Sequence, residues 1–71
     1  MRVDWFRLIT ELQATKVSLR KQSSVAEVAL ATVYYWKAGG EPKFYHGARL
    51  VQYYTSITGK PPPVQATMSS T

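Results

Sequence analysis

The sequence contains no cysteine and only one histidine, His46, among its 71 residues. Without cysteine, neither a disulfide framework nor a thiolate metal site is available to brace the fold. One histidine does not build a metal site alone, and the four carboxylates are scattered along the chain at Asp4, Glu11, Glu27 and Glu41. These shortages predict a protein that holds no metal and no cofactor.

The sequence also lacks long apolar runs and catalytic patterns. Its apolar stretches are far shorter than a membrane span, and the N-terminus has no apolar region of the signal-peptide type. It offers no Ser-His-Asp order, paired carboxylates or phosphate-cradling glycine loop, because Gly39 and Gly40 have the pattern of a helix stop. A chain this short also has little room for an elaborate active site. We therefore expect a soluble, cytoplasmic protein that is not an enzyme and that binds a macromolecule.

Basic residues outnumber acidic residues by 9 to 4, which gives a formal net charge of +5. The excess is unevenly placed, because the charges of residues 1–15 cancel and residues 16–60 carry all of it. Such a bias favours a polyanion or an acidic protein surface as the partner. It does not choose between these two classes of partner.

Capping residues and apolar spacing predict an all-α fold. Asp4 is a good N-cap for a helix over about residues 5–14, where apolar residues repeat at helical spacing. A last helix is expected over about residues 46–58, ended by Gly59 and the proline-rich stretch behind it. Its apolar side chains predicted to be buried are Leu50, Val51, Tyr54 and Ile57.

The end of the chain differs in composition from the rest. Residues 60–71 are rich in proline and then small and polar, with too little apolar surface to fold. The sequence thus predicts one helical domain over residues 1–59, followed by a flexible, disordered tail.

The segment between residues 19 and 38 admits two arrangements. It contains no glycine or proline, and the stretch from Ser24 to Glu27 has the pattern of a capping box. The apolar residues that follow fit one continuous helix over about residues 25–38. The alternative is two helices joined by a turn at Glu27, which would then occupy a left-handed position that favours glycine. Both arrangements remain open on the sequence alone.

Residues 33–43, VYYWKAGGEPK, resemble the end of the recognition helix and the following turn in small phage and prophage helix-turn-helix transcriptional regulators. The resemblance extends over roughly residues 4–61 and implies a compact helical bundle of helix-turn-helix type. It also implies phosphate contacts around the turn after the recognition helix, at Lys37, Lys43 and Arg49.

Two positions depart from the pattern of these regulators, apart from the turn at Glu27. Gln22 stands where an apolar, inward-facing residue is expected, which is a poor choice for a core position. Ala29 stands where the recognition helix is usually capped, and its side chain has no oxygen to serve as a cap. These departures disfavour the standard turn between the two helices.

In the frame of these regulators, Leu30, Tyr34 and Tyr35 point outward from the recognition helix. None of them carries the paired donor and acceptor groups that discriminate between bases. Exposed aromatic side chains are instead typical of protein interfaces, because they supply contact area with little loss of side-chain entropy. Single exposed apolar residues also occur without a function, so an incidental role for these three stays open.

Two functions follow as expectations. The first is a phage-type regulator of transcription that binds a protein, with host RNA polymerase as the target, since the chain resembles phage polymerase inhibitors in size and charge. The second is a Cro-like repressor that binds operator DNA as a homodimer. The partner-binding residues expected for these functions are Leu30, Tyr34, Tyr35, Lys37, Lys43 and Arg49.

Overall fold

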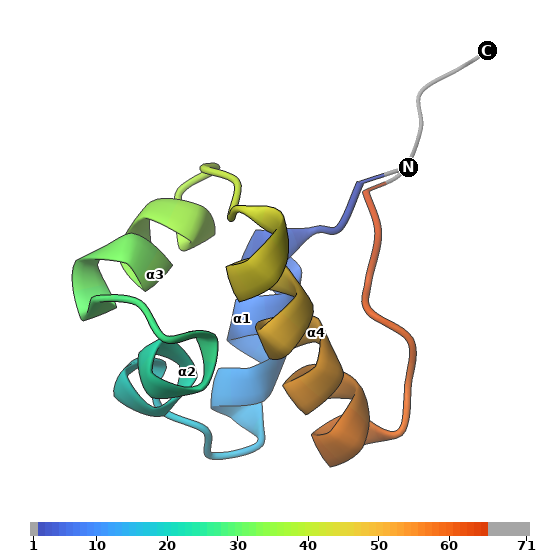
Figure 1. Ribbon diagram of the computed structural model, residues 1–71. Coiled ribbons are helices and arrows are strands. Elements are labelled where there is room, and N and C mark those ends of the chain that lie inside the picture. The colour runs from blue at the N-terminus through green and yellow to red at the C-terminus, as the bar shows by residue number, and fades with distance from the viewer. Residues whose placement is uncertain (1, 66–71) are drawn as a thin grey trace, which may run out of the picture.

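Four helices and the turns between them form the computed structural model, which describes residues 2–65 (Figure 1). The helices are α1 (Trp5–Ala14), α2 (Leu19–Ala26), α3 (Leu30–Lys37) and α4 (Phe44–Thr58). This part of the chain contains no β-strand, so the all-α prediction is confirmed. None of its helices is long and apolar enough to cross a membrane.

Most helix ends lie where the capping residues predict them. The Asp4 carboxylate accepts a hydrogen bond from the Arg7 amide at 3.1 Å, and the Ser18 hydroxyl accepts one from the Lys21 amide at 3.0 Å. At the other end of the domain, Gly59 adopts φ 71° and closes α4. The start of α4 differs by one half-turn from the prediction, because the helix begins two residues before His46.

The junction between α2 and α3 follows the second of the two arrangements. Glu27 adopts φ 62° and ψ 45°, so it ends α2 in the left-handed conformation, and the continuous helix over residues 25–38 is wrong. The expected capping box does not form, because Ser24 lies inside α2 and its carbonyl accepts the Glu27 amide at 3.2 Å. Ala29 precedes α3 and provides no side-chain cap, as the sequence predicts.

Side chains of α4 hold the C-terminal end of α2 in place. The last carbonyl groups of a helix have no partner inside the helix. Here Arg49 Nε donates to the Val25 carbonyl at 2.8 Å, and His46 Nδ1 lies 2.7 Å from the Ala26 carbonyl. Arg49 also pairs with Glu27 at 3.4 Å. The residues that make these contacts lie 20 or more positions away from α2 in the sequence. They stabilise a turn that the local sequence disfavours.

The core lies where the four helices face one another. Trp36 of α3 packs against Trp5 of α1, with ring centroids 6.2 Å apart. Two predicted core residues differ: Val51 is half-buried, and Ile57 is 44% exposed because it lies in the last turn of α4. The buried apolar residues are Leu8, Ile9, Leu12, Val17, Ala26, Val33, Trp36, Leu50 and Tyr54.

Gln22 is fully buried among these apolar side chains. Its amide nitrogen donates to the carbonyl groups of Ile9, at 3.2 Å, and of Val17, at 3.3 Å. Its amide oxygen has no hydrogen-bond partner among the described residues. The polar side chain at this inward position therefore connects α1 to the turn before α2.

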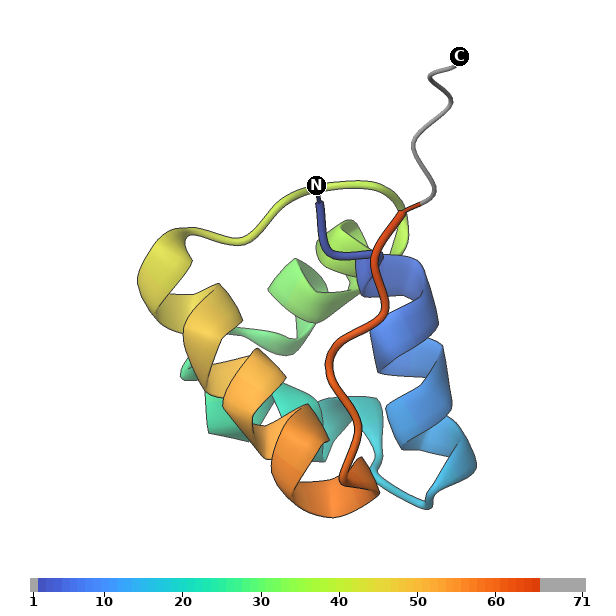
Figure 2. The same cartoon turned by 90° about the vertical axis from the view of Figure 1, so that its right-hand side faces the viewer.

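The structure describes the segment after α4 up to Gln65. It runs back across the gap between α4 and α1 toward the N-terminus (Figure 2). The Asp4 amide donates to the Pro63 carbonyl at 2.9 Å, and the Gln65 amide donates to the Arg2 carbonyl at 2.8 Å. Residues 60–65, the first part of the expected tail, thus lie against the N-terminal segment. The rest of the expected tail lies outside the described residues.

Candidate functional site: the exposed face of α3 and its basic neighbours

α3 lies at the edge of the domain, with one side in the core and the other in solvent (Figure 1). Val33 and Trp36 are buried, as predicted. Tyr34 and Tyr35 are 56% and 63% exposed, whereas Leu30 is half-buried. We call the exposed side the α3 face and define it by Ala31, Tyr34, Tyr35 and Ala38.

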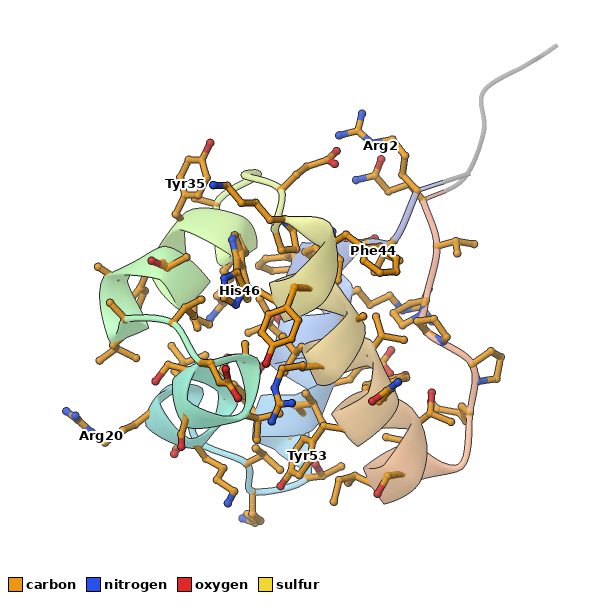
Figure 3. All side chains as sticks on the ribbon, in the orientation of Figure 1. Arg2, Arg20, Tyr35, Phe44, His46 and Tyr53 are labelled. Atoms are coloured by element: carbon orange, nitrogen blue, oxygen red, sulfur yellow. The ribbon has the colours of Figure 1, made fainter. Side chains whose placement is uncertain are left out.

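The turn after α3 fixes the position of one of these tyrosines. The Gly40 amide donates to the Tyr35 carbonyl at 2.8 Å, and Gly39 adopts φ 120°, which favours glycine. A Cβ atom at Gly40 would overlap the Tyr35 ring. The two glycines therefore end α3 and leave room for an aromatic ring that lies across the turn while most of its surface faces solvent (Figure 3).

The three basic residues predicted to contact phosphate occupy different settings. Lys37 is half-buried, and its ammonium group donates to the Gln13 side chain at 3.0 Å. Arg49 is bonded to the end of α2 and paired with Glu27. Lys43, at the start of α4, is exposed and forms no ion pair within residues 2–65. Of the three, Lys43 alone is presented to a partner without an intramolecular bond from its side chain.

All four carboxylates are used inside the domain. Asp4 caps α1, and each of the others pairs with a basic residue. The ion pairs join Arg2 to Glu41, Arg7 and Lys60 to Glu11, and Arg49 to Glu27. The unpaired positive charge therefore lies on basic residues that have no carboxylate beside them.

Arg20 and Lys21 are two such residues, in the first turn of α2. Both are exposed, and neither forms an ion pair in the described part of the chain. Arg20 extends away from α2 into solvent (Figure 3). Their charge is part of the excess visible in the sequence, and their place in the first turn after the helix cap Ser18 was a usable signal of exposure.

Phe44 is a second residue that the sequence analysis missed. It is 90% exposed, more than any other large apolar side chain of the described residues. Phe44 lies outside the helix that the sequence predicts over about residues 46–58, so helical spacing assigns it no role. It lies instead in the first turn of α4, on the side that faces the N-terminal segment (Figure 3).

Among the described residues, two ionisable groups have altered pKa values, and both lie between α1 and α4. The buried Tyr54 hydroxyl donates a hydrogen bond to Glu11, which also accepts one from Arg7 at 2.9 Å. These bonds, with that of Tyr54 the largest effect, lower the pKa of Glu11 from 4.5 to about 2. Burial and the bond to Glu11 raise the pKa of Tyr54. This network joins two helices and the start of the C-terminal segment, and it lies outside the α3 face.

Comparisons with protein-family models, with curated proteins and with solved structures find no match to this chain. Within residues 2–65, no group of three histidine, aspartate or glutamate side chains could hold a metal ion. The α3 face and the exposed basic residues near it are therefore the candidate binding features of the described residues.

Proposed function

We propose that this protein is a regulator of transcription of helix-turn-helix type, with α3 as its contact helix. Two features support the proposal. α2 and α3 are short helices of eight residues each, and a left-handed turn at Glu27 separates them. α3 presents one side to solvent while Val33 and Trp36 fix the other side in the core. A helix held in this way offers a fixed surface to a macromolecule.

The side chains of the α3 face indicate which class of partner it binds. Its exposed side chains are two alanines and the tyrosines Tyr34 and Tyr35. It contains no arginine, asparagine or glutamine, which are the side chains that discriminate best between bases. Two adjacent exposed tyrosines instead supply area and hydroxyl groups suited to a protein surface. We therefore propose that the α3 face binds a protein, and that a net charge of +5 favours an acidic surface on it.

The partner that we propose is host RNA polymerase, whose activity the protein would inhibit or modify. The test is direct binding of the purified chain to purified polymerase, together with transcription in vitro. Replacing both Tyr34 and Tyr35 by alanine should weaken binding at least about tenfold, the effect of losing a modest interface hot spot. Phe6→Ala, which removes an aromatic ring that is 56% exposed on α1, is the matched control. Absence of binding and of any change in transcription would overturn the proposal.

A second candidate function, operator binding in the manner of Cro, is favoured by the exposed basic residues. Arg20 and Lys21 lie at the start of α2, and Lys43 lies at the start of α4. Basic side chains and helix N-termini are the groups that position such proteins on the DNA backbone. With these contacts to the DNA backbone in place, the tyrosines of the α3 face would contact a groove of the DNA.

A salt titration of DNA binding separates the two functions. If DNA is the partner, binding is operator-dependent, and Arg20→Ala with Lys21→Ala reduces the slope of log K against log salt by about 2. Lys60→Ala is the control, because Lys60 is already paired with Glu11. Binding that is equally weak on every DNA sequence excludes the operator function and leaves the polymerase proposal in place.

A further inference from the structure

Two glycines follow each other after α3, and the backbone requires only the first of them. Gly39 adopts φ 120°, a conformation that favours glycine, whereas Gly40 has no positive φ. The Gly39 amide donates to the Trp36 carbonyl at 3.2 Å. The Gly40 amide donates to the Tyr35 carbonyl at 2.8 Å. This pair of bonds is the Schellman motif that commonly ends a helix, and it needs a left-handed residue at position 39 alone.

The Tyr35 side chain accounts for glycine at position 40. In a Schellman motif, the residue at the position of Gly40 often packs its own side chain on the residue at the position of Tyr35. Here the arrangement is reversed, because a Cβ atom at Gly40 would overlap three atoms of the Tyr35 ring. A Cβ atom at Gly39 would meet nothing within 4 Å among the described residues beyond its chain neighbours. The ring of Tyr35 thus occupies the space that any other side chain at position 40 would need.

A ring held in this way is partly ordered before any partner binds. Tyr35 is 63% exposed, so most of its surface is open to a partner, yet part of its ring lies against the backbone of the turn (Figure 3). Ordering a side chain on binding costs free energy, and a side chain that is already ordered avoids most of this cost. Tyr34 is exposed to a similar extent, 56%, but the contact with Gly40 is made by the ring of Tyr35.

We propose that Gly40 is a positioning residue for the Tyr35 ring, and that Tyr35 is the principal contact of the α3 face with its protein partner. The inference rests on the proposed function of the α3 face and ranks the two tyrosines of that face. Tyrosine is enriched among the residues that dominate protein interfaces, and it supplies contact area with few rotatable bonds. Gly40 acts through the ring and does not need to touch the partner itself.

Two alanine variants separate the position of the ring from the stability of the turn. Gly40→Ala keeps an allowed backbone conformation and forces an exposed ring to move, so the domain should keep its fold. Gly39→Ala strains the backbone and meets no side chain, so it should lower the melting midpoint and leave the ring in place. NMR of the natural chain and of Gly39→Ala should show cross-peaks between the Tyr35 ring protons and the Gly40 Hα protons. Absence of these cross-peaks from the natural chain overturns the positioning role.

Binding to purified host RNA polymerase tests what the position of the ring contributes. Tyr35→Ala should weaken binding at least about tenfold, as expected for an interface hot spot, and Tyr34→Ala should weaken it less. Gly40→Ala should weaken binding about fivefold, because the displaced ring has to be ordered when the partner binds. Gly39→Ala is the matched control, and below its melting midpoint it should bind as the natural chain does.

A double-mutant cycle shows whether Gly40 acts through Tyr35. The Tyr35→Ala chain has no ring to position, so adding Gly40→Ala to it should change binding by less than about twofold. An equal loss with and without the ring overturns the proposal, as do equal losses for the two glycine variants or a larger loss for Tyr34→Ala than for Tyr35→Ala. A natural chain that does not bind polymerase overturns the proposed function instead, and the NMR cross-peaks still decide whether Gly40 positions the ring.

Discussion

Gln22 shows how a single polar side chain is fitted into this core. Its amide nitrogen satisfies two carbonyl groups that belong to different segments, while its amide oxygen stays buried without a partner among residues 2–65. An unsatisfied buried polar atom costs about 1–3 kcal/mol, whereas each hydrogen bond contributes about 1 kcal/mol. The favourable and unfavourable terms at Gln22 are therefore of similar size.

We expect the charge of the side chain at position 22 to matter more than its hydrogen bonds. Gln22→Glu should lower the free energy of unfolding by about 3 kcal/mol, because a buried carboxylate has no donor to offer the two carbonyl groups. Gln22→Met should cost only about 1 kcal/mol, since it also removes the unpartnered oxygen. Urea denaturation measures both, with the exposed Gln52→Glu as the control. Equal losses for the two variants at position 22 would contradict this account.

The hydrogen bond between Tyr54 and Glu11 predicts a loss of stability in acid. The pKa of Glu11 is about 2 in the folded protein and near its ordinary value of 4.5 in the unfolded chain. A lowered folded pKa means that the contribution is fully present above pH 4.5 and is lost as the pH falls toward 2. The unfolding free energy of Glu11→Gln should therefore change less than that of the natural chain across this range.

The source of the lowered pKa is tested at the two neighbouring tyrosines. Tyr54→Phe removes the hydroxyl that contributes most to it, so the pKa of Glu11 should rise toward 4.5 in an NMR titration. Tyr53→Phe removes a hydroxyl of the adjacent residue and should leave the titration of Glu11 unchanged. A similar response to both substitutions would show that the Tyr54 hydroxyl is not what lowers this pKa.

At the scale of elements, two of the described residues other than glycine adopt a positive φ, and both lie where one helix gives way to the next. Lys16, with φ 74°, lies in the turn between α1 and α2, and Glu27, with φ 62°, ends α2. A left-handed residue with a side chain costs about 1–2 kcal/mol. Glu27 recovers part of this cost through Arg49 and through the hydroxyl of Tyr45, which donates to its carboxylate at 3.0 Å.

Glycine at these two turns should therefore have different effects. Lys16→Gly should raise the free energy of unfolding by about 1 kcal/mol, because it removes strain and no described side-chain bond. Glu27→Gly should raise it less, because the bonds to α4 are lost together with the strain. Thr15→Gly, at a residue with φ −94°, should lower it and serves as the control. Thermal unfolding measures all three, and a larger gain at position 27 than at position 16 would refute a stabilising role for the bonds of Glu27 to Arg49 and Tyr45.

Local sequence predicts the helix ends that depend on local contacts. The predicted cap at Asp4 and the predicted helix end at Gly59 each act within a few residues, and the structure confirms them; Ser18 caps α2 by an equally local bond. The turn at Glu27 is different, because the local sequence pattern favours a continuous helix there. The groups that stabilise the turn instead lie on α4. Those contacts join residues 20 and 24 positions apart, so the neighbouring residues carry no signal of them.

The candidate site also combines features that the sequence predicts with features that depend on the fold. The resemblance to helix-turn-helix regulators predicts that Leu30, Tyr34 and Tyr35 point outward, and the structure exposes the two tyrosines but leaves Leu30 half-buried. It does not predict that Lys37 bonds to Gln13 or that Arg49 bonds to α2, because both partners are 24 residues away. The charge of a basic residue is visible in the sequence, but its intramolecular partner depends on the fold.

At the scale of the whole molecule, the two ends of the described chain are paired with each other. Val3 and Val64 form an isolated antiparallel bridge. Hydrogen bonds on either side of it join Asp4 to Pro63 and Gln65 to Arg2. The proline content of the C-terminal segment predicted the absence of a helix there, but not this pairing, because its partner lies at the opposite end of the sequence.

We expect this pairing to stabilise the whole domain, and truncation measures its contribution. A chain that stops after Gly59 loses two backbone hydrogen bonds, the packing of Val64 and the ion pair of Lys60 with Glu11. At about 1 kcal/mol for each hydrogen bond and less for the exposed ion pair, the loss should be about 2 kcal/mol. For a domain of this size, that corresponds to a midpoint lower by about 8–16 °C.

A chain that stops after Gln65 is the control for this truncation, because it keeps every one of these contacts. Its melting midpoint should stay close to that of the full chain, while the shorter chain melts earlier. A hydrogen-exchange measurement adds a local readout, since the Asp4 amide donates to Pro63 and should lose protection in the shorter chain alone. If the chain ending at Gly59 melts with the control, residues 60–65 lie against the domain without stabilising it. The domain would then be energetically complete at Gly59, as the composition of the sequence predicts.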